Sequence, residues 1–211
     1  MKKFIGWIIL IIFLVGMDQW MKIWIKTNMI EGEQVSVLGN WFYLYFIENP
    51  GAAFGLFKNQ IWFKPVLSVL RIIILGLIIW FFLRFQKYNR CPIGVKICFA
   101  LILAGAIGNI IDSIFYGILF SESYPNVAIF LPEQGGYAPL LYGKVVDMFY
   151  FPIIKTTFPS WVPFLGGQYF EFFKPIFNFA DSYITISMFL LLIFYRKWFK
   201  KIQSKKSIPI E

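Results

Sequence analysis

Three aspartates lie within or beside long apolar runs, at positions where a charged side chain is costly. They are Asp112, Asp147 and Asp181. An acid placed in or near hydrocarbon usually faces a partner or a water-filled cavity, where it serves chemistry or transport. Carboxylates gathered at such a place cannot all ionise, so one of them keeps its proton. Two aspartates that share a proton are the electrical signature of an aspartic peptidase, which uses them to activate water.

Asparagines accompany these aspartates. Asn109 precedes Asp112 by three residues and Asn178 precedes Asp181 by three, so each pair is expected to share one face of a helix. A third asparagine, Asn49, starts an Asn-Pro-Gly turn that follows an aromatic segment. One site at the outer face of a membrane could include all of these side chains together with Asp147.

Each of these residues also has a structural interpretation. An asparagine in a membrane span often forms only a helix–helix hydrogen bond. Asp181, at the start of an apolar run, could cap a helix and complement its dipole. Asp112 could brace the fold together with Asn109. Asp147 is expected in an outer loop, and taken alone it is a solvated loop acid.

Two further polar positions are predicted to be structural. Asp18 lies four residues before Lys22 and eight before Lys26, so an ion pair along one helix face is available near the outer end of the first span. Arg71 lies near the middle of the second span, where it either extends its charge toward the membrane surface or pairs with an acid.

The elements that must position these residues are membrane helices. Of the 211 residues, 59% are hydrophobic, and the mean hydropathy is +0.67, which indicates an integral membrane protein. A span needs about 20 apolar residues. The sequence predicts an all-α membrane protein, a single integral membrane domain over residues 1–211, with four transmembrane helices at about 4–25, 62–85, 94–119 and 177–198.

The outer connections, 26–61 and 120–176, are long enough to need structure of their own. Aromatic and β-branched residues between 34 and 47 predict a small extracytoplasmic β-sheet. The second connection is rich in proline and glycine and is expected to be a long extracytoplasmic loop. Its aromatic clusters at 149–152 and 170–173 are interpreted either as short amphipathic helices at the membrane interface or as ordinary loop packing.

The distribution of charge predicts the orientation. The proposed inner segments hold 12 of the 20 Lys and Arg residues and one of the 11 acids, and the rest of the chain holds 8 basic and 10 acidic residues. The positive-inside rule then puts both termini in the cytoplasm and the candidate site at the extracytoplasmic face. The net charge of +9 is therefore expected to come from basic residues at the cytoplasmic side of the membrane. Nothing in it resembles a nucleic-acid-binding surface.

The residue types exclude several kinds of chemistry. The chain contains no histidine, which excludes Ser-His, Cys-His and His-ligated metal sites, and no metal or cofactor is expected. Cys91 and Cys98 are expected to be reduced and structural. The apolar run after Met-Lys-Lys lacks a small-x-small cleavage site, so we expect a retained first helix.

At these residues the chain resembles the lipoprotein signal peptidases (signal peptidase II), which are bacterial inner-membrane aspartic proteases. Five pieces match in family order: Asp-Gln at 18–19 with Lys22, Asn-Pro-Gly-Ala-Ala-Phe-Gly (49–55), Gly-Asn-Ile-Ile-Asp (108–112), Val-Val-Asp-Met (145–148) and Phe-Asn-Phe-Ala-Asp-Ser-Tyr-Ile (177–184). Any one of these motifs is weak, but five in order with four spans are specific.

The resemblance implies a role for each matched residue. The catalytic pair corresponds to Asp147 and Asp181. Four polar residues would support the site or contact substrate and inhibitor: Asn49, Asn109, Asp112 and Asn178. The implied substrate is a prolipoprotein whose cysteine carries diacylglycerol, cleaved just before that cysteine. Membrane lipids and globomycin-type peptide inhibitors are the other expected partners.

The sequence departs from the family in two places. The family has arginine after the third-span aspartate, whereas this chain has Ser113, and Lys144 or Arg71 could replace the missing cation. The spacing of the motifs is also larger, with 34 residues between Asp112 and Asp147 and 33 between Asp147 and Asp181. These look like insertions in the outer loop.

Three other functions remain open on the residues alone. Intramembrane Asp and Asn also build cation paths, which would suit an ion- or proton-coupled transporter, but no broken-helix repeat is visible. A Ser/Lys peptidase would use Ser113 or Ser182, but no lysine stands at helical spacing from either near the motifs. A non-catalytic assembly subunit is the third alternative.

Overall fold

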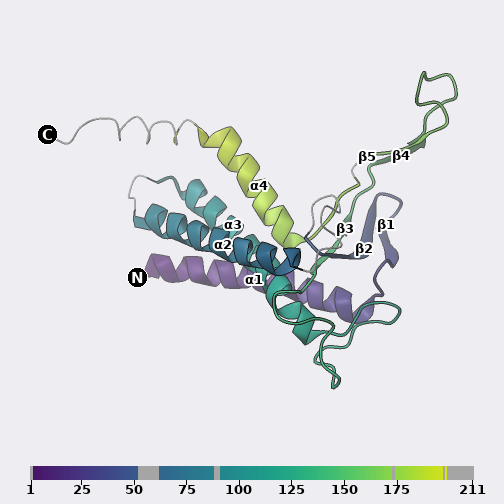
Figure 1. The fold of residues 1–211 in the computed structure, drawn as a ribbon. Helices are drawn as coiled ribbons and strands as arrows, with labels where there is room; N and C mark the ends of the chain where they lie inside the picture. Colours follow the sequence, from purple (N-terminus) through teal and green to yellow (C-terminus); the bar gives the residue numbers. More distant parts are fainter. Residues whose placement is uncertain (1, 52–61, 88–90, 173, 197, 199–211) are drawn as a thin grey trace. The chain divides into compact units, whose positions relative to one another are not determined.

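The computed structural model of the chain describes residues 2–51, 62–87, 91–172, 174–196 and 198 (Figure 1). Some expectations lie outside these residues: the end of the 49–55 motif from Ala52 onward, the basic residues Arg90 and Lys197, and the basic tail from residue 199. The chain forms two compact units. The first contains residues 1–19, 66–111 and 179–211, and the second contains residues 20–65 and 112–178.

Four helices form at the positions of the four predicted spans. They are α1 (Lys2–Asn28), α2 (Phe63–Lys87), α3 (Ile93–Leu119) and α4 (Phe179–Phe194). The first three contain segments long and apolar enough to cross a membrane, by length and composition, at Phe4–Asn28, Phe63–Gln86 and Ile93–Leu119. The fourth is a shorter apolar helix of 16 residues. It begins two residues later than expected, because Phe177 belongs to a β-strand.

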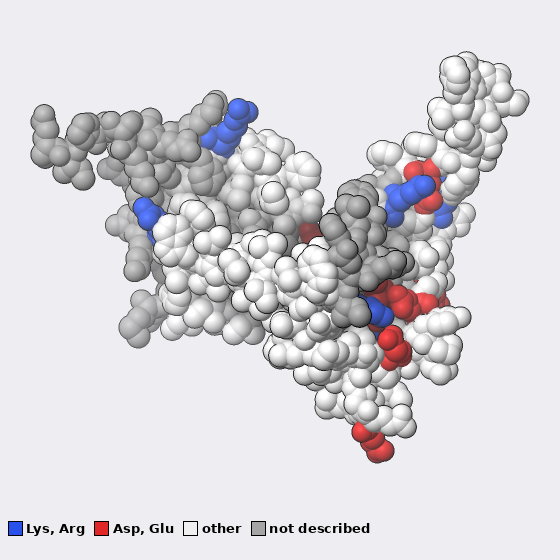
Figure 2. All heavy atoms as spheres, in the orientation of Figure 1, with Lys and Arg blue, Asp and Glu red and all other residues white. Residues whose placement is uncertain are grey.

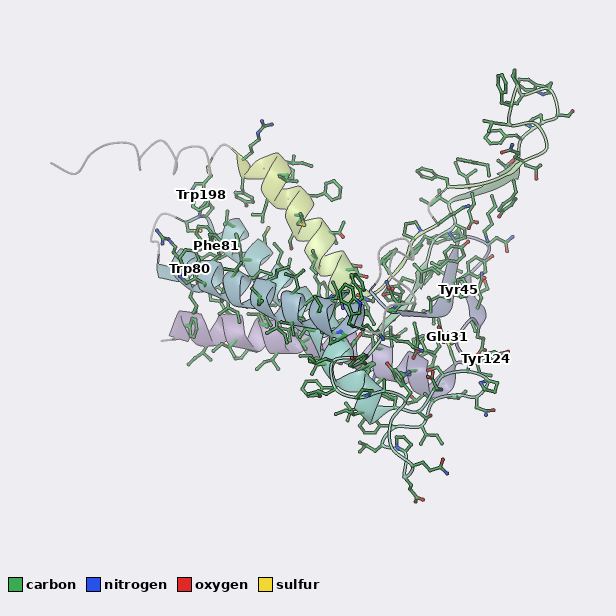
Figure 3. All side chains as sticks on the ribbon, in the orientation of Figure 1. Glu31, Tyr45, Trp80, Phe81, Tyr124 and Trp198 are labelled. Carbon is green, nitrogen blue, oxygen red and sulfur yellow. The ribbon has the colours of Figure 1, made fainter. Side chains whose placement is uncertain are left out.

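In the first unit, the helices share a core and leave their other faces apolar. Phe82 of α2 packs with Ala100 and Leu103 of α3. The outer face of α2 carries large exposed rings, among them Trp80 and Phe81, which are 52% and 41% exposed (labelled in Figure 3). A helix that is apolar on every side is suited to lipid rather than to water.

Two glycines of α3 allow the start of α4 to approach closely. A Cβ at Gly105 would collide with the carbonyl oxygen of Ala180. A Cβ at Gly108 would lie 2.5 Å from Asp18 Oδ2 and 3.3 Å from the Ala180 Cβ. Any larger residue at these two positions would push the two helices apart.

The second unit is built on small antiparallel sheets. A four-stranded sheet has the order β1-β2-β3-β6, from β1 (Gln34–Leu38), β2 (Phe42–Asn49), β3 (Val145–Tyr150) and β6 (Ile176–Phe177). A separate two-stranded sheet pairs β4 (Ile154–Thr157) with β5 (Tyr169–Phe172). The strands expected between 34 and 47 are confirmed, and the sheet also recruits two strands from the second long connection.

The expectation of short helices at 149–152 and 170–173 is wrong, because the described residues of both segments lie in or beside strands. Isolated helices of four residues are too short to be stable. The segment Val145–Tyr150 instead pairs with β2, with Ile47 opposite Asp147 and Asn49 opposite Val145. Its β-branched and aromatic residues favour this pairing. The second connection is therefore partly a sheet and not only a loop.

Candidate active site

Asp147 lies in the middle of β3 and is 4% exposed. Each oxygen of its carboxylate accepts a hydrogen bond from a side-chain amide. Asn49 Nδ2 donates to Oδ2 over 3.0 Å, and Asn178 Nδ2 donates to Oδ1 over 2.7 Å. Both donors are uncharged, so these two bonds fix the orientation of the carboxylate without neutralising it.

The interpretation of Asp147 as a solvated loop acid is wrong, since the residue is buried in a strand. Its neighbours explain the burial. Val145, Val146 and Met148 are all buried, so the whole start of β3 is covered. A buried carboxylate must be hydrogen-bonded, and the two amides meet that need.

The main chain of β3 is held on both sides at Val146. Its N–H donates to Asp112 Oδ2 over 3.3 Å, and its carbonyl accepts from Asn178 Nδ2 over 3.3 Å. Asn178 is the residue immediately before α4, rather than part of a helix face as expected. These bonds set the position of the strand one residue before Asp147.

Asp112 forms a buried ion pair with Lys22 of α1. The Nζ–Oδ2 distance is 2.8 Å and both side chains are fully buried. Asp112 therefore has the contacts of a structural brace, through Lys22 and the Val146 N–H. The cation beside Asp112 is therefore Lys22. From the sequence, Lys144 or Arg71 was expected to supply this cation, because residue 113 is a serine and not an arginine.

In the first unit, Asp181 lies in the first turn of α4 and its Oδ1 accepts a hydrogen bond from Asn109 Nδ2 over 2.8 Å. The start of the same helix is capped from α1. Asp18 Oδ1 accepts from the Ala180 N–H over 2.9 Å, and Gln19 Nε2 bridges Asp18 Oδ2 and the Gly108 carbonyl. Free N–H groups at a helix start need such acceptors. Asp18 therefore caps α4, which differs from the ion pair that its spacing predicted, since Lys22 pairs with Asp112 and Lys26 with Glu48.

The structure therefore gathers the expected residues in two groups. The second unit brings together Asn49, Asp112, Asp147 and Asn178, with Lys22. The first unit brings together Asn109 and Asp181, with Asp18 at the same helix start. Among the described residues, no group of three or more His, Cys, Asp or Glu side chains could hold a metal ion.

A charged cluster beside Asn49 was missed by the sequence reasoning. Glu48 is buried and pairs with Lys26 through Oε1 and with Lys144 through Oε2, the latter at 2.7 Å. Lys144 also reaches Glu122 at 3.3 Å, and its N–H donates to Tyr137 Oη over 2.7 Å. The one available signal was that Lys26 follows Lys22 by four residues, on the same face of α1.

The electrostatics favour the charged states of Glu48 and Lys144 in this cluster. Burial tends to raise the pKa of Glu48, but the attraction of Lys26 and the hydrogen bonds from Lys144 and Lys26 outweigh it, and the pKa is lowered. Burial tends to lower the pKa of Lys144, but the hydrogen bond and charge of Glu48 raise it overall. Because Glu48 lies next to the end of β2 and Lys144 immediately precedes β3, the cluster fixes the paired strand ends at Asn49 and Val145.

The same cluster contains a serine–lysine contact, in which Lys26 Nζ donates to Ser123 Oγ over 2.7 Å. Both side chains are fully buried, and Lys26 is paired with Glu48. A Ser/Lys peptidase needs an accessible hydroxyl, whereas that of Ser123 is buried and donates to Glu48 Oε1 over 2.9 Å. This contact is therefore structural.

Comparisons with known proteins agree on one family. A sequence profile described as "Signal peptidase (SPase) II" matches residues 10–197. A lipoprotein signal peptidase of Porphyromonas gingivalis is 46% identical over 201 residues, which cover 95% of this chain and 87% of that protein. One of Amoebophilus asiaticus is 36% identical over 85% of this chain and 72% of its own length.

Two solved structures of bacterial membrane enzymes share the fold of this chain. A bacterial membrane enzyme determined by the in meso method at 1.9 Å resolution superimposes with a TM-score of 0.60 at 26% identity. The match covers 91% of this chain and 93% of that one. A second such enzyme, at 2.3 Å resolution, gives a TM-score of 0.59 at 25% identity and covers 98% of this chain and 94% of the other.

Proposed function

The chain belongs to the signal peptidase II family, and we propose from this premise that Asp147 and Asp181 are its catalytic pair. Family membership makes it a bacterial membrane protease that acts as a lipoprotein signal peptidase. The aspartic type of catalysis and the identity of the two residues are our proposal. The observation that carries it is the buried Asp147 carboxylate, held by one amide on each oxygen.

The second aspartate is linked to the first through the chain. Asn178 donates to Asp147, and Asp181 follows Asn178 by three residues. Three residues span at most about 10 Å, even when fully extended. The backbone therefore tethers Asp181 to the residue that holds Asp147, which supports the assignment of these two acids as partners.

In the proposed reaction, one aspartate of the pair is ionised and removes a proton from water. The other is protonated and polarises the scissile carbonyl, and the water oxygen attacks the carbonyl carbon. The protonated acid then gives its proton to the leaving amine as the peptide bond breaks. The two groups titrate as a pair, so neither is assigned the proton. Asn49, Asn109 and Asn178 orient the two carboxylates.

The proposed substrate is a prolipoprotein with diacylglycerol on its cysteine, cleaved just before that cysteine. We further propose that α4 is the core of a fourth span. Its 16 residues rise only about 24 Å, which is less than the core of about 30 Å, so flanking residues must supply the rest of the length. Both termini would then be cytoplasmic and the site extracytoplasmic, as the basic residues favour. Lipids and globomycin-type inhibitors would be its other partners.

The decisive experiment is cleavage of a diacylglyceryl-modified prolipoprotein by the purified protein and by Asp147→Asn and Asp181→Asn. Each substitution keeps the shape and removes the titratable group, so we expect folded variants without activity. Glu133→Gln, at an exposed acid, is the matched control and should retain full activity. Activity in either aspartate variant would overturn the assigned pair and direct attention to Asp112.

The same assay separates the alternatives. A Ser/Lys peptidase requires loss of activity in Ser113→Ala or Ser182→Ala, whereas the aspartic mechanism expects both to cleave normally. The comparisons give no support to a transporter. A non-catalytic subunit would tolerate both Asp→Asn changes.

We also propose that the aromatic outer segments clamp the substrate peptide. Removal of residues 120–140 without a change in KM or kcat would contradict that clamp.

A further inference from the structure

The hairpin formed by β4 and β5 exposes many large apolar side chains. Phe164 is 98% exposed and Trp161 is 79% exposed at its end. Six more line the strands and their flanks: Ile153, Ile154, Leu165, Tyr169, Phe170 and Phe172. Within the second unit, the hairpin extends well beyond the strands β1, β2 and β3 (Figure 1).

A two-stranded hairpin is marginally stable by itself in water. Its strand residues are almost all exposed. Exposed apolar surface that is this continuous usually marks a contact with a partner or a membrane. The shape and composition of the hairpin therefore require a covering partner, and its charges and hydrogen bonds indicate which one.

The end of the hairpin carries no charge. The 15 residues from Thr156 to Phe170 contain no Asp, Glu, Lys or Arg. The nearest charged residues, Lys155 and Glu171, lie opposite each other in the pairing of β4 with β5. In Figure 2 the projecting end is accordingly white, and blue and red spheres occur only at its base. Charge thus divides the hairpin into a polar base and an apolar end.

More than half of the backbone N–H groups at this end are hydrogen-bonded within the segment. The N–H groups of Phe158, Val162, Gly166, Gly167 and Gln168 all donate to carbonyls inside the segment 158–168. The Gln168 side chain is also used internally, since its Nε2 donates to the Phe164 carbonyl over 3.1 Å. Internal pairing of polar groups lowers the cost of leaving water, which is the condition for contact with lipid.

Phe164 adds a backbone observation. Its φ of 65° lies in the left-handed region, which a bulky residue adopts only at a cost. Such outliers concentrate at functional positions. Here the unusual conformation accompanies an aromatic side chain that is almost completely exposed.

We propose that the segment 158–168 is a membrane-docking loop whose aromatic side chains enter the headgroup region of the bilayer. Trp is enriched at that depth because its ring is apolar and its N–H remains hydrogen-bonded. A specific protein partner would require about one hydrogen bond per 100–200 Å² of contact, whereas five of the nine backbone N–H groups of this loop and the Gln168 amide already donate internally. The proposal rests on the membrane location of the protein and not on the catalytic assignment.

The test uses the full chain in lipid nanodiscs. Cys91 and Cys98 are replaced by alanine, Phe164→Cys is introduced, and the new cysteine carries a nitroxide. Collisions with oxygen, which dissolves in lipid, are compared with collisions with a nickel chelate, which stays in water. We expect Phe164 to favour oxygen, at a depth of about 5–10 Å below the headgroup surface.

Two control positions calibrate the measurement. Glu133→Cys, in another exposed loop of the same unit, should favour the nickel chelate, and Phe13→Cys on the apolar face of α1 should favour oxygen. Nickel accessibility at 164 equal to that at 133 would overturn the proposal in favour of a solvated loop. Protection from both reagents would overturn it in favour of a protein partner, such as a second copy of this chain.

A second measurement avoids the cysteine substitutions. Brominated lipids quench the fluorescence of nearby tryptophans, and the difference between the wild type and Trp161→Phe isolates Trp161. We expect that difference signal to be quenched by brominated lipid. A difference signal insensitive to bromine would contradict the proposal, whether or not the preparation cleaves prolipoprotein.

Discussion

Asp147 and Asp112 are both buried acids of the second unit, and each accepts hydrogen bonds from a different kind of group. Asp147 accepts hydrogen bonds from the neutral amides of Asn49 and Asn178, whereas Asp112 accepts from the ammonium of Lys22. The ion pair joins Asp112 to α1, whereas the two amides fix the orientation of the Asp147 carboxylate. The contrast supports a brace at Asp112 and a reacting group at Asp147.

The buried ion pair makes a prediction about stability. Lys22→Met should destabilise the protein by about 3–5 kcal/mol, because it leaves Asp112 buried without its cation. Thermal unfolding in detergent measures this loss, with Lys155→Met at an exposed lysine as the matched control. The double variant Lys22→Met with Asp112→Leu should recover much of the loss. Wild-type stability in the single variant would contradict the brace.

The amide of Asn49 makes a prediction about rate. Asn49→Ala removes one hydrogen bond to Asp147, a kind of bond that contributes about 1.5–3 kcal/mol when one partner is charged. If the bond is needed in the transition state, kcat should fall roughly 10- to 100-fold. Asn28→Ala, at an exposed amide of α1, should leave kcat unchanged. A raised KM with normal kcat would instead assign Asn49 to substrate binding.

Glu48 makes a prediction about pH. Its pKa in the folded protein is lowered from the ordinary value of 4.5, so its contribution to stability is complete above pH 4.5 and is lost as the pH falls through the lower folded value. Lys144 has a raised pKa, so its contribution is complete below 10.5 and is lost at higher pH.

This prediction is tested by measuring the unfolding temperature between pH 3 and pH 7. This range spans the ordinary pKa of a glutamate side chain, 4.5. Glu48→Gln should be less stable than the wild type at pH 7, and its stability should fall less on acidification. Parallel curves for the two proteins would show that Glu48 does not carry the acid-sensitive stability.

At the scale of elements, the contact between α3 and the start of α4 depends on two small residues. Gly108→Ala should cost about 1–3 kcal/mol, since the added methyl group meets Asp18 and Ala180. Gly76→Ala on α2 is the matched control, with nothing within 4 Å of the new Cβ, and should be neutral or stabilising. Equal stability of the two variants, measured by thermal unfolding, would mean that α3 and α4 can separate without cost.

Pairing of β2 with β3 is the other element-level feature that matters for the site. It sets Asn49 opposite Val145 and Ile47 opposite Asp147. A one-residue slip would turn the Asp147 side chain to the other face of the sheet. The Lys26–Glu48–Lys144 cluster and the Asp112 bond to Val146 both hold this register.

At the scale of the whole molecule, the charge distribution makes a prediction about orientation. In intact cells, a membrane-impermeant maleimide should label Glu133→Cys from outside and should not label Lys206→Cys until the membrane is permeabilised. The reason is that 12 of the 20 basic residues lie in the proposed inner segments. The reverse labelling pattern would place the second long connection in the cytoplasm.

The sequence by itself determined the family, the positions of the helices and the candidate site residues. Apolar length and composition are local properties, so they predicted α1, α2 and α3 to within a few residues. The motifs around Asp147 and Asp181 required no structure to identify the family. Aromatic and β-branched content also predicted the strands between 34 and 47.

Only the tertiary structure decided which side chains meet. Asp147 belongs to a strand because β2, about 100 residues earlier in the chain, pairs with it. Asp112 pairs with Lys22 from another helix, and Glu48 collects Lys26 and Lys144 from distant segments. Such contacts depend on the packing of segments that lie far apart in the sequence, and no local pattern predicts that packing. The burial of a charge is decided by its neighbours in space and not by those in sequence.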